Sequence, residues 1–251
     1  MDPRLTIIER RLKDIKRIIA VSGGKGGVGK SLTASVMALI FSRLGYKTGL
    51  LDLDFGGPSI HTVLGLKGAL PREEKGIIPP DAHGIKFMSI IHYAGDNPSP
   101  IRGIDISNAM IELLAITRWG RLDFLIIDMP PGIGDSTRDS TLDVIRLLKR
   151  AEFLIITTES RVTLDVVKKL LNLLKGLKVC IIGIIENMRL TRSSFSSKEI
   201  GALDVPFLGE IDFDSGLEDA IGNVDVILKT RFAESMKEII VSKEIFKLKD
   251  R

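Results

Sequence analysis

The stretch that decides the fold is SGGKGGVGKS, residues 22–31. It follows an apolar, β-branched run, Ile18–Val21, and it precedes a long segment with helical character, Ser31–Leu44. The run predicts a buried strand, and the segment predicts a helix that ends at Gly45. Glycines between the two permit positive φ angles and a close approach of the backbone to a ligand. The stretch therefore predicts a strand, a tight glycine-rich loop and a helix in direct succession.

Within this stretch, Gly24–Ser31 matches the P-loop spacing of a glycine, four residues and Gly-Lys-Ser. In such a loop backbone N–H groups point inward and form an anion site, to which the N-terminal end of the helix adds positive charge. Lys30 suits the β- and γ-phosphates, and the Ser31 hydroxyl suits Mg²⁺. A chance match in a glycine-rich turn is the alternative. We expect ATP and Mg²⁺ as ligands, with nucleotide contacts from Gly24, Lys25, Gly26, Gly27, Val28, Gly29, Lys30, Ser31 and Leu32.

The rest of the chain repeats the alternation of strand and helix. Four strands are nearly continuous apolar runs, which indicates burial on both faces, as in a parallel sheet covered by helices. We therefore predict a three-layer α-β-α P-loop NTPase fold with a mostly parallel central sheet. The predicted strands are Arg17–Ser22, Thr48–Asp52, Ile85–Ile91, Asp123–Asp128, Phe153–Thr158, Val179–Ile185 and Phe207–Ile211. The predicted helices are Ser31–Leu44, Ile104–Arg118, Ser136–Lys149, Thr163–Leu174 and Phe232–Val241, with a short leading helix at Leu5–Ile15.

Composition sets the domain organisation and excludes several classes of protein. The chain has 251 residues, of which 44% are hydrophobic and 27% are charged, which suffices for one α/β domain with a large core. We predict a single domain over residues 1–251, with a leading segment 1–16 and a tail 242–251. A net charge of +4 is too small over this length to indicate a nucleic-acid partner. No apolar run approaches the ~18 residues that span a bilayer, and the N-terminus lacks a secretory signal, so we expect a cytoplasmic protein.

Carboxylates stand where two of the predicted parallel strands end. Asp52 and Asp54 lie on the same side of the chain at the end of one strand, and Asp128 ends the apolar run Phe124–Ile127. Ligands bind at this edge of open α/β sheets, and carboxylates there suit Mg²⁺ or a positioned water. An acid after an apolar strand is the Walker B pattern, although an aspartate in an ordinary turn is the alternative. The proline-rich loop that follows places the amide of Gly132 to sense a γ-phosphate.

The heptad KGGVGKS, Lys25–Ser31, contains an early lysine that a generic P-loop does not need. It resembles the deviant Walker A motif of the MinD/ParA/Mrp superfamily of dimeric ATPases, in which this lysine reaches the partner's nucleotide. A cation supplied in trans stabilises the charge that develops on the γ-phosphate; a solvated loop lysine is the alternative. The resemblance implies an ATPase that forms a homodimer with the nucleotides at its interface. It implies catalytic roles for Lys25, Lys30 and Asp54, the last as the residue that orients the attacking water, and Mg²⁺ near Ser31, Asp52 and Asp128.

Further motifs resemble the Mrp/ApbC branch of that superfamily. They are DMPPGIGD at 128–135, GPS at 57–59, RG at 102–103, ENM at 186–188 and LGEI at 208–211. This resemblance implies that Asn187 hydrogen-bonds the adenine, and an amide that both donates and accepts suits that task. An asparagine that caps a turn after a strand is the alternative. The usual role of the branch is to carry or assemble iron–sulfur clusters.

The sequence departs from this branch at the cluster site. The branch has a Cys-x-x-Cys shortly after Glu-Asn-Met, whereas residues 189–197 read RLTRSSFSS and contain no cysteine. Serine hydroxyls are poor ligands for cluster iron, for which thiolates are the rule. The single cysteine, Cys180, falls in a predicted apolar strand, where we expect it to be buried. We therefore expect no iron–sulfur cluster on this chain alone.

Two functions remain open on this basis. The first is an Mrp-type ATPase that assists iron–sulfur cluster or other metallocofactor assembly together with a cysteine-bearing protein partner. The second is a MinD/ParA-like regulator whose ATP-dependent dimer controls localisation or a partner's activity. The motifs favour the first and the missing cysteines favour the second. The tail Val241–Arg251 mixes apolar and basic residues, as in MinD-type membrane anchors, but a docked terminal segment is the more common use of such a tail.

Overall fold

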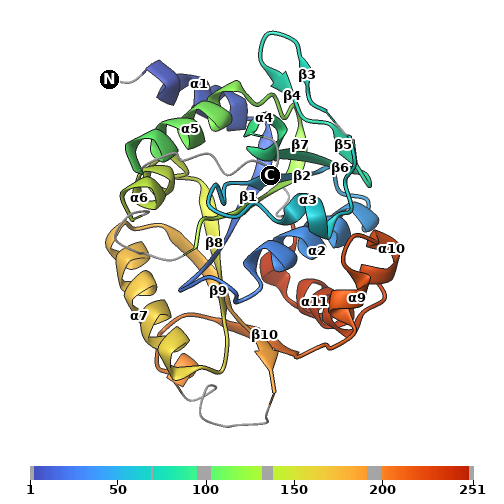
Figure 1. The fold of residues 1–251 in the computed structure, drawn as a ribbon. Coiled ribbons are helices and arrows are strands. Elements are labelled where there is room, and N and C mark those ends of the chain that lie inside the picture. Colours follow the sequence, from blue (N-terminus) through green and yellow to red (C-terminus); the bar gives the residue numbers. More distant parts are fainter. Residues whose placement is uncertain (1–2, 69, 95–102, 132–137, 191–198, 249–251) are drawn as a thin grey trace.

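A central β-sheet lies between two layers of helices in the computed structural model, which describes residues 3–68, 70–94, 103–131, 138–190 and 199–248 (Figure 1). The sheet has eight strands in the order β10-β9-β8-β1-β7-β2-β6-β5. All neighbouring strands are parallel except β5 and β6. This architecture confirms the predicted three-layer fold with a mostly parallel sheet. The main strands are β1 (Ile15–Gly23), β2 (Thr48–Asp52), β6 (Ile85–Ser89), β7 (Leu122–Asp128), β8 (Ala151–Thr157), β9 (Cys180–Arg189) and β10 (Phe207–Asp212).

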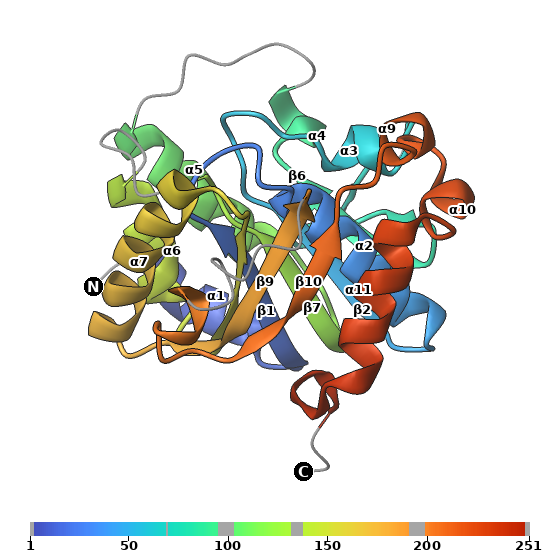
Figure 2. The ribbon, with the colours of Figure 1, turned by 90° about the horizontal axis from the view of Figure 1, so that it is seen from below.

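The two helical layers follow from the alternation of apolar side chains along the central strands. On β1, Ile19 and Val21 face one buried cluster, while Ile18 and Ala20 face the other. One layer contains α1 (Pro3–Leu12), α5 (Gly103–Ile116), α6 (Arg138–Leu147) and α7 (Arg161–Gly176), and the other contains α2 (Lys30–Arg43), α9 (Leu217–Ala220), α10 (Val224–Ile227) and α11 (Arg231–Ser242) (Figure 2). Burial of large apolar side chains on both faces, at about 1.5–3 kcal/mol each, holds the three layers together.

The structure adds several short elements that the sequence pattern did not predict. Residues 66–84, where no strand or helix is predicted, contain β3 (Arg72–Glu73), β4 (Ile77–Ile78) and β5 (Asp81–Ala82). The four-residue helices α3 (Ile60–Val63) and α4 (Ile91–Ala94) follow β2 and β6. Elements of two to four residues are too short to display a period of 2 or 3.6, which is why the pattern is silent about them.

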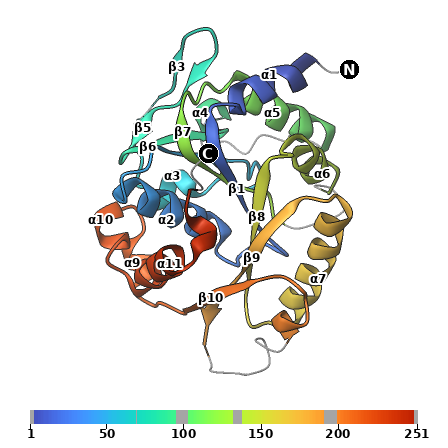
Figure 3. The same ribbon diagram turned by 180° about the vertical axis from the view of Figure 1, so that it is seen from behind.

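The C-terminal segment is docked against the body of the protein. A short 3₁₀ turn, η1 (Glu244–Phe246), follows α11, which packs beside α2 and β10 (Figure 3). Phe246 is buried, and its ring centroid lies 6.4 Å from that of Phe41 on α2. Among the described residues, no helix has the length and apolar character that crossing a membrane requires.

The position of Cys180 differs from the prediction. It is the first residue of β9 and is exposed, whereas the apolar run had suggested burial. The reason is its place at the start of the strand, because the layers cover Ile182, Ile184 and Ile185 farther along β9.

Candidate nucleotide site

The glycine-rich loop joins the end of β1 at Gly23 to the start of α2 at Lys30, as predicted. Gly27 and Gly29 have φ angles of 76° and 88°, in the left-handed region that only glycine adopts without cost. Lys25, Gly26 and Gly27 are exposed, whereas Val28 and Lys30 are buried. The first half of the loop therefore projects from the carboxyl edge of the sheet, and the second half returns into the protein.

Asn187 on β9 holds the second half of this loop. Its Nδ2 donates a hydrogen bond to the Val28 carbonyl oxygen at 2.9 Å, and the residue is 2% exposed. A Cβ atom at Gly29 would lie only 2.3 Å from the same Nδ2. The backbone angle thus favours glycine at position 29, and a larger residue there would also displace the Asn187 amide that bonds Val28. The predicted contact of Asn187 with adenine stays a prediction, and its support of the loop is an added finding.

Three predicted carboxylates meet beside the loop. Asp52 and Asp128 are register partners at the ends of β2 and β7, and Asp128 is also the register partner of Val21 on β1. Asp52 and Asp128 are completely buried, and Asp54 is 9% exposed. The register of β2 and β7 therefore places these acids near Lys30 and Ser31, the first residues of α2.

Burial raises the pKa values of two of these acids. It raises the pKa of Asp128 to about 7; the Ser31 hydroxyl and the charge of Lys30 lower that pKa, and the charge of Asp54 raises it. The pKa of Asp52 is well above its ordinary value because of burial and the charge of Asp128. These buried positions therefore oppose the accumulation of negative charge unless a cation is present.

The donor set fits Mg²⁺. Both carboxylate oxygens of Asp128 are buried, and neither accepts a hydrogen bond of ordinary geometry from the described residues. A buried anionic oxygen without a donor is costly, so this carboxylate needs a cation or its bound water. No group of three or more histidine, cysteine or acidic side chains among the described residues forms a metal cage. Mg²⁺ suits such a site, since it commonly takes one or two protein ligands and completes its shell with phosphates and water.

A residue that the sequence analysis missed, Ser89, supports the acidic group. Its hydroxyl, at the end of β6, donates to Asp52 Oδ2 at 3.1 Å. The other oxygen of Asp52 accepts a hydrogen bond from the Asp54 backbone N–H at 3.0 Å. A single serine at a strand end matches no motif, and only the sheet order, which places β6 beside β2, reveals the contact.

The structure does not test the roles predicted for Leu32, Lys25 and Gly132. Leu32 is partly buried on α2 and packs against the core, and Lys25 forms no ion pair with any described residue. Gly132, the predicted γ-phosphate sensor, lies outside the described residues. The roles assigned to these three residues stay predictions.

Comparison of the sequence with known proteins identifies the family of this chain. The sequence model of the ParA family, described as NUBPL iron-transfer P-loop NTPase, matches residues 14–244. An iron-sulfur cluster carrier protein of Methanocaldococcus jannaschii is 34% identical over 93% of this chain and 86% of its own length. The Aquifex aeolicus protein of the same name is 40% identical over 71% of this chain, and the match spans only 49% of that relative. A cytosolic Fe-S cluster assembly factor NUBP2 homolog of Dictyostelium discoideum is 35% identical, over 81% of this chain and 83% of its own length.

Solved structures agree with the sequence relatives. A nucleotide-binding protein from Archaeoglobus fulgidus in complex with ADP, with cobalt found in it, has a TM-score of 0.75 and 31% identity. The match covers 90% of this chain and 93% of that protein. MinD from Pyrococcus horikoshii, complexed with Mg-ADP, has a TM-score of 0.64 at 19% identity, over 89% of this chain and 93% of MinD, which shows a shared fold.

Proposed function

The chain belongs to the ParA family of NUBPL-type iron-transfer P-loop NTPases, and from this membership together with the site we propose that it is an ATPase that assists metallocofactor assembly. It binds ATP with Mg²⁺, hydrolyses the ATP to ADP and phosphate, and uses this cycle in iron–sulfur cluster or related assembly. The observation that carries the proposal is the buried carboxylate of Asp128, which lies beside Ser31 and Lys30 and accepts no hydrogen bond of ordinary geometry from the described residues. Such an acid is costly unless a cation and phosphates join it.

Each site residue has a chemical role in this proposal. The loop N–H groups and the charge of Lys30 hold the β- and γ-phosphates at the N-terminal end of α2. Ser31 and Asp128 hold Mg²⁺, which when bound neutralises charge on the phosphates. Asp54, the least buried of the three acids, orients the water that attacks the γ-phosphate.

We propose a homodimer with the nucleotides at its interface. The exposed Lys25 lies at the carboxyl edge of the sheet, where a cation can reach a partner's nucleotide. Apolar side chains at the same edge are unusually exposed: Val162 (67%), Leu190 (71%) and Phe213 (53%) follow the neighbouring strands β8, β9 and β10. Exposed apolar side chains grouped at one edge favour a protein–protein contact there.

The assembly role rests on relatives whose names state it, and it requires a partner. Iron–sulfur clusters are held by thiolates, and the chain has one cysteine. We therefore propose that a second protein with the missing thiolates holds the cluster while this chain supplies the ATP-driven step. The Dictyostelium relative is named a cytosolic factor, which supports a cytoplasmic location for this chain too.

Substitution of Lys30 tests the ATPase. We expect Lys30→Ala to reduce the rate of phosphate release by about 10²- to 10³-fold and to weaken binding of a fluorescent ATP analogue. The reason is that the variant lacks the buried cation that stabilises the negative charge of the phosphates. Lys47→Ala is the matched control, since Lys47 is an exposed lysine just before β2, at the opposite edge of the sheet. Undiminished turnover in Lys30→Ala would refute the assignment.

Substitution of Lys25 by alanine tests the dimer in a separate measurement. This variant is expected to keep the fluorescent nucleotide as a monomer, since Lys25 is exposed and its proposed target is the partner's ATP. It should lose the dimer that wild type forms with ATP, as measured by light scattering after size exclusion. Equal dimerisation of the two proteins with ATP would exclude the trans role.

A further inference from the structure

Ser89 connects two segments of the site through its hydroxyl group. The residue is completely buried at the end of β6, where it is the register partner of Asp52 on β2. Its Oγ lies 3.1 Å from Asp52 Oδ2 and 3.3 Å from the backbone nitrogen of Ile91, the first residue of α4. Asp52 Oδ1 in turn lies 3.0 Å from the backbone nitrogen of Asp54. These contacts form a continuous chain from α4 to Asp54.

The chemistry of the groups sets the direction of each hydrogen bond. A backbone N–H only donates, so Ser89 Oγ accepts from Ile91 and directs its single proton to Asp52. The Asp54 N–H also donates, so Asp52 accepts at both oxygens. Both contacts favour the charged form of Asp52, because a carboxylate accepts hydrogen bonds and does not donate them. The two donors thus stabilise charge on Asp52 at a position where burial opposes it.

Asp128 differs from its register partner in this respect. Its two oxygens accept no hydrogen bond of ordinary geometry from described residues, whereas each oxygen of Asp52 accepts one. The two buried acids therefore have different roles. Asp128 is available to bind Mg²⁺, while Asp52 accepts a hydrogen bond from the backbone of the segment that follows β2.

We propose that Ser89 is a positioning residue for Asp54, acting through Asp52. This inference rests on the proposed ATPase function, because it assigns the means by which the carboxylate that orients the attacking water is held in place. Displacement of a reacting group by about 1 Å costs on the order of 10²-fold in rate. A hydroxyl group that fixes the Asp54 backbone can therefore affect the rate strongly. Ser89 itself contacts neither the glycine-rich loop nor Lys30 in any described hydrogen bond.

The test compares wild type with Ser89→Ala in two measurements. The first is hydrogen exchange of the Asp54 amide by NMR in the nucleotide-free protein, where loss of the donor to Asp52 should speed exchange about tenfold or more. The second is ATP turnover with Mg²⁺, where we expect kcat to fall about 10- to 100-fold. The KM for ATP should stay within about twofold, because the loop and Lys30 that bind the phosphates are unchanged.

Thr117→Val is the matched control. Thr117 is also completely buried, and its hydroxyl donates to the Leu113 carbonyl oxygen at 2.5 Å, at the opposite edge of the sheet from Asp52. This variant should lose stability without a change in kcat or in Asp54 exchange. An equal fall of kcat in both variants, or no change in Ser89→Ala, would overturn the proposal.

Wild type alone provides an outcome that does not depend on folding of the variant. Its Asp54 amide must exchange more slowly than the amides of exposed loop residues, since it donates to Asp52. Rapid exchange of this amide in wild type would refute the chain of contacts. Failure of the ATPase assignment is distinguishable, because it would appear as absence of turnover in wild type while the exchange result stands.

Discussion

Asp128 has an ionisation equilibrium that couples the stability of the site to pH. Its pKa in the folded protein is raised to about 7, above its value in the unfolded chain, chiefly because of burial. The folded state therefore holds this proton more tightly than the unfolded state, and stability falls as pH rises from about 4 to about 7. The cost of ionising this buried carboxylate is the reason that the site favours a cation.

This coupling predicts the behaviour of Asp128→Asn. The nucleotide-free variant should be more stable than wild type at pH 7–8, by up to a few kcal/mol, and the difference should shrink steadily as the pH falls and vanish only below about pH 4. A melting temperature changes by about 2–4 °C per kcal/mol in a domain of this size. Calorimetry across this pH range checks it, with Asp204→Asn as the control because that side chain is fully exposed. The same dependence of melting temperature on pH in wild type and Asp128→Asn would contradict the prediction.

The residues of the site divide into those that motifs reveal and those that only the fold reveals. The loop, Asp52, Asp54 and Asp128 are predictable because each stands at a strand end in a recognisable spacing. Ser89 is not predictable, because its importance comes from the order of strands in space. The bond from Asn187 to Val28 is missed for the same reason, since the two residues are 159 positions apart.

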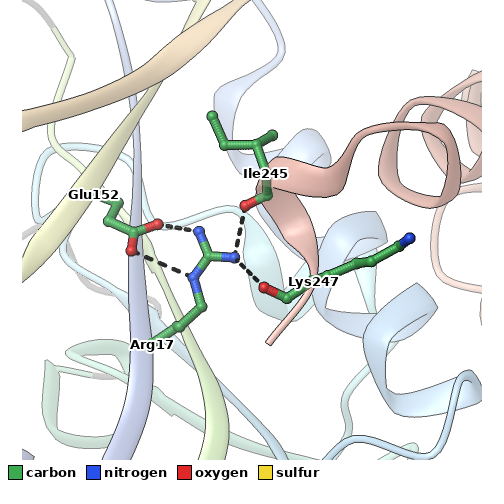
Figure 4. A network of polar contacts seen from close by, with 4 residues as sticks. All are labelled: Arg17, Glu152, Ile245 and Lys247. Atoms are coloured by element: carbon green, nitrogen blue, oxygen red, sulfur yellow. Dashed lines mark hydrogen bonds and ion pairs between the residues drawn. The ribbon is translucent and has the colours of Figure 1, made fainter. Parts of the chain in front are cut away.

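At the scale of elements, Arg17 fastens the C-terminal segment to the sheet (Figure 4). It stands on β1 and forms an ion pair with Glu152 on β8, with Nε 3.3 Å from Oε1. Its Nη1 donates to the carbonyl oxygens of Ile245 at 2.6 Å and Lys247 at 3.2 Å. A guanidinium serves both partners at once because it carries five N–H donors in a planar fork.

Arg17→Lys should release this segment. The ammonium group of lysine keeps the charge that pairs with Glu152, but it lacks the planar fork that reaches both carbonyl groups. We therefore expect the free energy of unfolding to fall by about 1–3 kcal/mol. Tryptic cleavage after Lys243 and Lys247, followed by mass spectrometry, should become faster, while ATP turnover stays unchanged because the contact lies at the edge opposite the loop. Lys16→Ala is the control, since Lys16 pairs with Asp123 from an exposed position. Unchanged cleavage in Arg17→Lys would refute the fastening role.

The long elements are predictable and the short ones are not. All seven predicted strands and the six predicted helices are present, with ends that differ by a few residues. Helix α7 shows the limit of end signals: Gly176 is its last residue, but the left-handed position lies at Lys178, with φ of 55°. Local hydrogen bonds close this end, since the backbone N–H groups of Lys178 and Val179 donate to the carbonyl oxygens of Lys175 and Leu174. The left-handed angle therefore falls on a lysine two residues after the glycine.

At the scale of the whole molecule, the length of the strands separates the only cysteine of the sequence, Cys180, from the nucleotide loop. Strand β9 begins with Cys180 and ends at Arg189, just before the serine-rich segment that lacks cysteines. Ten residues of strand span about 30 Å at 3.3 Å each. The exposed thiol of Cys180 therefore stands at the opposite edge of the sheet from the nucleotide loop.

This separation predicts the result of anaerobic reconstitution with iron and sulfide. The purified chain should retain only substoichiometric iron and show no stable cluster absorbance, because one thiol per chain does not supply the thiolates that a cluster requires. Cys180→Ser should behave like wild type. The double variant Ser193→Cys/Ser196→Cys restores a Cys-x-x-Cys spacing after Glu-Asn-Met and should gain iron with cluster absorbance. Stoichiometric iron on wild type that survives gel filtration would overturn the need for a thiolate-bearing partner, and its loss in Cys180→Ser would identify the unexpected ligand.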